Sequence, residues 1–136
     1  MALKAEILLP GDAVTGTCLA LTAPISFWGG VDPASGTIID ARHPERGQNI
    51  AGRILALPGT IGSSSASAVL LELVHAGKAP AALLMDAPDA ILLLGLVVAR
   101  EMGWPTPPAF RLAAADQTLL ADRRIAISAE GRISVG

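Results

Sequence analysis

The sequence has little charge and few aromatic rings. Charged residues make up 16% of the 136 positions, and the aromatic residues are two Phe and two Trp, with no Tyr. The formal net charge of −2 gives no basic surface for a phosphate backbone, and so few rings leave little for bases to stack on. Both shortages argue against nucleic acid as a ligand.

Metal-binding side chains are also scarce. The single cysteine, Cys18, has no partner for an internal disulfide, and His43 and His75 are the only histidines. A zinc or cluster site usually takes about four such ligands. We therefore expect no metal ligand in this chain, and we expect any metal that its function needs to be held largely by another polypeptide.

Long hydrophobic runs are absent as well. The most apolar stretch, residues 90–99, lies between Asp89 and Arg100 and is far shorter than the roughly 20 residues that span a membrane. Lys4 and Glu6 near the start of the chain do not fit a secretory signal. These features predict a cytoplasmic chain without a membrane segment, and they favour a buried helix for residues 90–99.

Hydrophobic residues nevertheless make up 51% of the chain, which is enough for a buried core, and the length fits one domain spanning residues 1–136. Alternating, β-branched or continuous apolar runs predict short strands. We expect these strands at residues 4–9, 14–21, 37–40, 53–57, 81–85, 109–112, 124–128 and 132–135, the last two forming a hairpin.

Two helices are predicted between the strands. Apolar residues recur at helical spacing after Ser63 and Ser64, either of which can cap the helix, and Gly77 can end it. Asp89 can cap a second helix that ends near Met102. The sequence thus predicts a β-rich α/β fold with two principal helices.

The segment 58–67, PGTIGSSSAS, is the best candidate site. It joins a strand to a helix and places Gly62, Ser63, Ser64 and Ser65 where the first helical amides lack partners. Such a turn favours a carboxylate, a phosphate or a serine oxyanion formed during proton abstraction. The alternative is a capped helix after a tight turn, with no role in binding.

Two further segments are candidates for substrate binding. Residues 26–33 place Trp28 beside Gly29 and Gly30 and form a possible binding lip; alternatively, the aromatic rings cover the core edge and the glycines make a bend. In residues 40–49, Arg42 could hold a carboxylate and His43 could shuttle protons, or both could belong to a surface loop of mixed charge.

Other polar side chains have simpler interpretations. His75 lies near the end of the first predicted helix, where a cation suits the helix dipole, and Cys18 lies in an apolar strand. Asp86 and Asp89 flank a proline at a strand-to-helix turn, where capping is the expected role. We therefore predict structural roles for all four.

Several motifs in a fixed order resemble the small subunit or swivelling domain of the aconitase X family. They are SFWGGVDP at 26–33, GTIIDARHP at 36–44, GQNIAGRILALP at 47–58 and GSSSAS at 62–67, and the likeness continues through the second predicted helix. The resemblance implies a swivelling β/β/α domain. It also implies a larger catalytic subunit, fused or, as the length suggests, separate, that holds an iron–sulfur cluster or iron.

The same resemblance implies a function. Members of this family dehydrate small hydroxy acids, either cis-3-hydroxy-L-proline or a phosphorylated mevalonate. The family's serine base falls on Ser63, with Ser64 next to it. Many relatives have Gly-Arg-Gly-Ser there, whereas this chain has Gly-Thr-Ile-Gly-Ser at 59–63 and lacks the arginine. The missing cation favours cis-3-hydroxy-L-proline, and it leaves Arg42, Arg53 or the partner to hold the substrate carboxylate.

Three alternatives to this hydro-lyase subunit remain open from the sequence. The first is a phosphomevalonate dehydratase small subunit. The second is a stand-alone module that binds a small anion, and the third is a structural partner that stabilises a larger protein without touching substrate.

Overall fold

The computed structural model describes residues 2–136, and it contains one eight-stranded sheet and four helices. The strands are β1 (Ala2–Lys4), β2 (Glu6–Leu9), β3 (Val14–Ala20), β4 (Ile54–Leu57), β5 (Ala82–Met85), β6 (Ala109–Arg111), β7 (Arg124–Ile127) and β8 (Arg132–Val135). The helices are α1 (Phe27–Gly30), α2 (Ala66–His75), α3 (Ala90–Glu101) and α4 (Ala114–Thr118). The β-rich α/β fold with two principal helices, α2 and α3, is confirmed.

The sheet curls so that its two ends approach each other. Its strand order is β1-β8-β7-β3-β4-β5-β6-β2, with β3, β4, β5 and β6 parallel and the outer pairs antiparallel. The end strands β1 and β2 are separated in the chain by Ala5 alone, whose amide donates to the Gly131 carbonyl at 2.8 Å. The strand predicted at 4–9 is confirmed over Glu6–Leu9 but is wrong in including Lys4 and Ala5, because the chain crosses from one end of the sheet to the other at Ala5.

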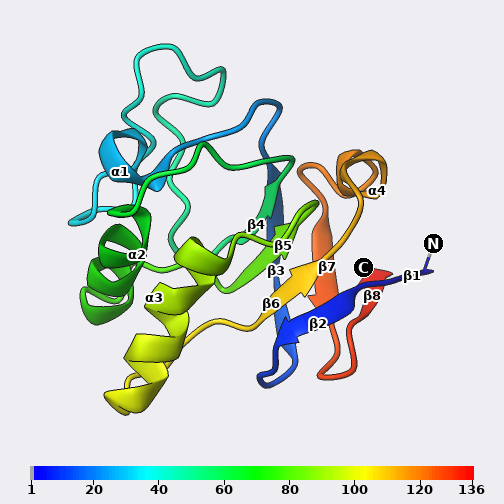
Figure 1. Cartoon of the computed structure of the whole chain (residues 1–136). Helices are drawn as coiled ribbons and strands as arrows, with labels where there is room; N and C mark the ends of the chain where they lie inside the picture. Colours follow the sequence, from blue (N-terminus) through cyan, green and yellow to red (C-terminus); the bar gives the residue numbers. More distant parts are fainter. Residues whose placement is uncertain (1) are drawn as a thin grey trace.

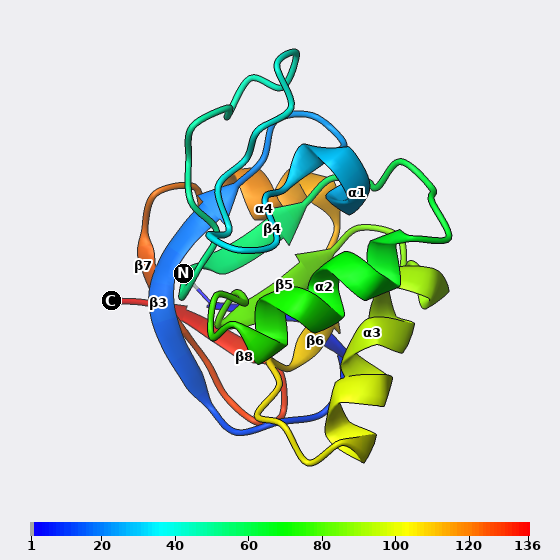
Figure 2. The same ribbon diagram turned by 90° about the vertical axis from the view of Figure 1, so that its left-hand side faces the viewer.

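Both faces of the central strands are buried. In β4, Ile54 and Ala56 face the core inside the curled sheet, whereas Leu55 and Leu57 face the core under the helices; β5 alternates in the same way. Helices α1, α2 and α3 lie on one side of the sheet, and the chain termini lie on the other (Figures 1 and 2). Burial on both faces explains why these strands are continuous apolar runs.

The principal helices end as the sequence predicts. Gly77 follows α2 with φ +71°, and the amide of Lys78 donates to the Leu73 carbonyl at 2.9 Å, which closes the last turn. Asp89 caps α3, because its Oδ1 accepts from the amides of Ile91 at 3.0 Å and Leu92 at 3.1 Å. No helix within residues 2–136 is long and apolar enough to cross a membrane.

The structural roles predicted for three other side chains are also confirmed. The ring of His75 stacks on Trp104 with 4.6 Å between centroids, and Cys18 is fully buried inside the curled sheet. Asp86 acts at a different helix from the one expected: its Oδ1 accepts from the amide of Ala114, at the start of α4.

The predicted strand at 37–40 is wrong. Thr37 and Ile38 make only isolated bridges, to Asn49 and Val31, within a long loop that turns back on itself. Gly36 has φ +83°, so the chain bends just before the expected strand instead of entering the sheet. The short elements α1 and α4 were not predicted. One turn of helix, as in α4, leaves no periodic pattern to detect, and in α1 the backbone at Trp28 (ψ 119°) and Gly29 (φ +79°) is not helical.

Candidate functional site

The serine segment is a loop that joins β4 to α2 and is tied at two points. The hydroxyl of Thr60 donates to Asp89 Oδ2 at 2.7 Å, which connects the loop to the start of α3. The amide of Ile61 donates to the Ile25 carbonyl at 3.0 Å, which connects it to the segment leading into α1. The loop thus has a defined course before it reaches Gly62 and the serines.

The serines form a tight turn at the start of α2. Ser63 accepts twice, from the amide of Ser65 at its Oγ (3.2 Å) and from the amide of Ala66 at its carbonyl (3.1 Å). Ser63 is half-buried, whereas Gly62, Ser64 and Ser65 are exposed. Three hydroxyls therefore lie on an ordered turn within reach of solvent.

The first turn of α2 has no side-chain cap. Ser65 occupies the N-cap position with φ −86° and ψ −6°, and its side chain makes no capping hydrogen bond. The predicted capping by Ser63 or Ser64 is wrong, because the helix begins after them. The carboxylate of Asp89 offsets the positive charge of the helix dipole at the start of α3. No side chain caps the corresponding end of α2, which is left open to an external anion.

A cavity of about 420 Å³ lies beside this turn and is bounded by α1, α2 and the loop after α1. Trp28, Gly29 and Ser65, three residues predicted to bind substrate, line it together. Trp28 is 61% exposed while Phe27 is buried, so Phe27 belongs to the core and Trp28 does not. Gly29 has φ +79°, a left-handed conformation that glycine adopts without strain.

The other predicted residues lie outside this cavity. Gly30 is buried, and a Cβ atom there would approach Ile25 Cγ1 to 3.1 Å, so it lies in the packing beneath α1. Arg42 is exposed on the neighbouring loop, and its amide donates to Asp40 Oδ1 at 3.0 Å. A role for the Arg42 guanidinium in binding stays a prediction.

His43 uses both ring nitrogens inside the protein. Its Nε2 is 3.0 Å from the Ala23 carbonyl and its Nδ1 accepts from the amide of Glu45 at 3.1 Å. This pattern is that of a neutral imidazole with the proton on Nε2. The ring is buried and joins the 40–49 loop to the segment before α1, so proton shuttling by His43 stays a prediction that this geometry does not support.

Glu72 lines the same cavity and was missed by the sequence analysis. Ser65, Ala68, Val69 and Glu72 follow one face of the start of α2 at helical spacing. That spacing is the signal that would have connected Glu72 with the serines. Nearby, hydrogen bonds from the Ser35 hydroxyl and the Ala34 amide lower the pKa of Asp32 and keep that turn charged.

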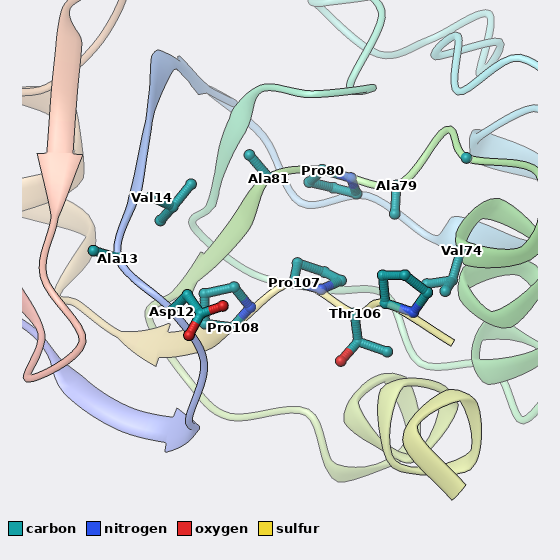
Figure 3. A pocket seen from close by; sticks show the side chains of 12 residues that line it. Asp12, Ala13, Val14, Val74, Ala79, Pro80, Ala81, Thr106, Pro107 and Pro108 are labelled. Atoms are coloured by element: carbon teal, nitrogen blue, oxygen red, sulfur yellow. The ribbon is translucent and has the colours of Figure 1, made fainter. Parts of the chain in front are cut away.

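A second cavity, of about 440 Å³, lies at the opposite end of α2. Figure 3 shows the rings of Pro107 and Pro108 with Asp12 on one side and Pro80 on the other. Val74 and Gly77, at the end of α2, also line it. It contains one charged side chain and none of the predicted site residues, so we do not assign the site to it.

An iron or iron–sulfur group does not fit the residues of this chain. Within residues 2–136, no group of three or more His, Cys, Asp or Glu side chains is arranged to hold a metal ion. Cys18 lies in the core, where burial raises the pKa of its thiol to about 11 and disfavours the thiolate that binds metals.

The outer face of α3 carries an exposed apolar stripe. Ile91, Leu94, Val98 and Met102 follow one another at helical spacing and are all exposed, and Ile61 of the serine loop is exposed as well. Since Thr60 is bonded to the residue that caps α3, the stripe starts next to the serine loop. Contiguous exposed apolar surface of this kind marks interaction sites.

Comparisons with known proteins agree on one family. Residues 2–135 match the sequence model of the aconitase X swivel domain. The chain is 49% identical to a cis-3-hydroxy-L-proline dehydratase of Pseudomonas aeruginosa over 72% of its own length but only 18% of that protein. It is 39% identical to a phosphomevalonate dehydratase small subunit of Thermococcus onnurineus, over 73% of this chain and 75% of that subunit.

The fold has a counterpart of known structure. A chain in the crystal structure of Thermococcus kodakaraensis aconitase X in its holo-form superposes with a TM-score of 0.86 at 28% identity. The superposition covers 100% of this chain and 98% of that one.

Proposed function

The chain belongs to the aconitase X swivel-domain family, and we propose that it is the small subunit of a hydro-lyase that dehydrates cis-3-hydroxy-L-proline. Relatives carry this activity in their names, and the phosphomevalonate dehydratase relative is called a small subunit. The chain spans less than a fifth of the Pseudomonas dehydratase. The proposed activity therefore includes a larger catalytic subunit.

The observation that carries this proposal is the uncapped start of α2 with three serines on an anchored turn. Dehydration removes a proton from the carbon next to the carboxylate and hydroxide from the neighbouring carbon. The electron pair of the broken C–H bond forms the C=C bond, and the departing hydroxide takes up a proton to leave as water. The site must hold a carboxylate and accept one proton. The amides of an open helix N-terminus can hold the carboxylate, and a serine oxyanion that they stabilise can accept the proton.

Ser63 is the residue that we propose accepts the proton. A serine hydroxyl is a weak base, so its oxyanion must be stabilised. The amide of Ser65 already donates to Ser63 Oγ at 3.2 Å, and the positive end of α2 lies beside it. Both favour the anionic form of Ser63. Ser64 and Ser65, which are exposed on the same turn, then remain to contact the substrate carboxylate.

The larger subunit supplies what this chain lacks. Any iron or iron–sulfur group belongs with that subunit in this proposal, because the residues described here do not form a metal site. We place the larger subunit on the apolar stripe of α3. A subunit that covers Leu94 and Ile91 would also reach Ile61 and close the serine loop from solvent.

The test is dehydration of cis-3-hydroxy-L-proline by the complex of this chain with its large subunit, prepared without oxygen and with iron. We expect turnover only when both chains are present. Ser63→Ala should lower kcat by about 10²–10⁴-fold, as loss of a general base does. Ser67→Ala, which removes a half-buried hydroxyl from the second residue of the same helix, is the matched control and should keep its activity.

Two outcomes would overturn parts of the proposal. Turnover of phosphomevalonate in place of cis-3-hydroxy-L-proline would reassign the substrate. Full activity of Ser63→Ala would move the base to Ser64 or to the large subunit, and Ser64→Ala in the same assay would decide between them.

A further inference from the structure

The cavity beside the serine turn has an unusual balance of charge. Its walls are mostly apolar, and among the described residues that line it none is basic. Its ionisable group is the carboxylate of Glu72, and its aromatic ring is Trp28. Around Glu72 and Trp28, where the lining offers one carboxylate, one indole and no cation, the cavity does not suit an anionic group such as a phosphate.

Glu72 has no ionic partner within the part of the chain that the structure describes. The ion pair within residues 2–136 joins Arg111 to Asp86, and the neutral His43 ring lies 4.0 Å from the Glu45 carboxylate; neither contact involves Glu72. The side chain is exposed, so its charge is available to a ligand in the cavity. A carboxylate without a partner becomes costly once a second subunit covers it, unless the ligand brings a positive charge.

Trp28 complements this carboxylate. Trp28 is 61% exposed and belongs to α1, whereas Glu72 belongs to α2, and both line this cavity. The face of an indole attracts cations, and a carboxylate forms its strongest hydrogen bonds with charged N–H donors. The same cation can therefore contact both groups.

We propose that Trp28 and Glu72 form the subsite that binds the ring ammonium of the substrate. This inference rests on the proposed dehydratase function and adds to it the residues that select the substrate. A secondary ammonium has two N–H donors for the Glu72 carboxylate and a charge that the Trp28 ring attracts. A phosphorylated anion would instead meet the negative charge of Glu72, which disfavours it.

The spacing along α2 fits a small amino acid. Glu72 lies seven positions after Ser65, a rise of about 10 Å at about 1.5 Å per residue. Helical side chains point back toward the N-terminus. The carboxylate of Glu72 can therefore reach about half of the distance along the helix axis from its own Cα to Ser65. A ligand whose carboxylate lies at the open helix start can then place its ammonium group at Glu72, in a cavity of about 420 Å³.

The experiment uses two unreactive ligands of similar shape as competitive inhibitors of the complex. L-Proline carries the ring ammonium, and tetrahydrofuran-2-carboxylate has an ether oxygen in its place. In Glu72→Gln we expect the inhibition constant of L-proline to rise about 10- to 100-fold, as loss of a charge-assisted hydrogen bond predicts. In Trp28→Leu it should rise about three- to ten-fold. The constant for the ether should change little in both variants.

Two variants serve as controls. Glu6→Gln removes an exposed carboxylate on β2, outside the cavity, and should leave both inhibition constants unchanged. Glu72→Asp keeps the charge on a shorter side chain and should give an intermediate constant for L-proline.

The outcomes separate this inference from the proposed function. If the wild-type complex dehydrates cis-3-hydroxy-L-proline while Glu72→Gln binds L-proline as tightly as wild type, the ammonium subsite is wrong and the function stands. The subsite is also wrong if Glu72→Gln weakens both inhibitors equally. If the wild-type complex neither turns over the substrate nor is inhibited by L-proline, the proposed function fails.

Discussion

Thr60 and Asp89 share one hydrogen bond that links the serine loop to the start of α3. Thr60 Oγ1 donates to Asp89 Oδ2 at 2.7 Å, while Asp89 Oδ1 accepts from the amides of Ile91 and Leu92. One carboxylate therefore caps a helix with one oxygen and anchors the site loop with the other. The two functions can be separated by substitution.

We expect Asp89→Ala to lower the free energy of unfolding by about 1–2 kcal/mol, because it removes the cap of α3. Asp89→Asn should lose much less, since its oxygen can still accept from the amides at the start of the helix. Its NH₂ group can still donate to the Thr60 hydroxyl and keep the loop attached. Thr60→Val removes that hydroxyl and leaves the cap of α3 intact, so it should reduce kcat/KM of the complex with little loss of stability. Urea unfolding and steady-state kinetics test this, and equal stability losses in Asp89→Asn and Asp89→Ala would contradict it.

Gly95 lets α3 pack directly on the first turn of α2. A Cβ atom at Gly95 would lie 2.5 Å from the carbonyl oxygen of Ser67, so the helices would have to separate. We expect Gly95→Ala to destabilise the protein by about 1–3 kcal/mol, although alanine gains about 1 kcal/mol in helix propensity. Gly62→Ala, where nothing lies within 4 Å of the added methyl, is the control. Thermal unfolding measures both, and a stabilised Gly95→Ala would refute the packing argument.

The stripe on α3 predicts where the large subunit binds. Leu94 is 52% exposed and Leu119, on another part of the surface, is 49% exposed. Glutamate at either position should change the stability of the isolated chain little. We expect Leu94→Glu to weaken binding of the large subunit by about 2 kcal/mol or more, and Leu119→Glu to leave it unchanged. Calorimetric titration measures the affinity of each variant for the large subunit. Unchanged binding by Leu94→Glu together with weakened binding by Leu119→Glu would place the interface elsewhere.

Cys18 makes stability depend on pH in the alkaline range. Burial is the largest cause that raises its pKa from 9.0 to about 11. As the pH rises, the thiol therefore loses its proton in the unfolded chain before it does so in the folded chain. Its contribution to the free energy of unfolding is complete below pH 9 and is lost as the pH rises through 11. Between pH 8.5 and 10.5, the free energy of unfolding of wild type should fall more than that of Cys18→Ala. Parallel slopes in urea titrations would show that the thiol does not contribute.

The sequence by itself determined the order and the ends of most elements. Apolar runs set β4 and β5, Gly77 ended α2, and Asp89 began α3, because turns, caps and periodicity depend on neighbours within a few residues. The motifs at 26–67 also identified the family and directed attention to the serine turn.

Only the tertiary structure decided which side chains meet. It placed Trp28 and Ser65 around one cavity with Glu72, buried His43 against Ala23, and divided the first strand at Ala5. These outcomes depend on how the curled sheet closes and on which helix faces lie together. Such contacts join residues far apart in the chain, and the local patterns that specify a helix or a strand carry no information about them.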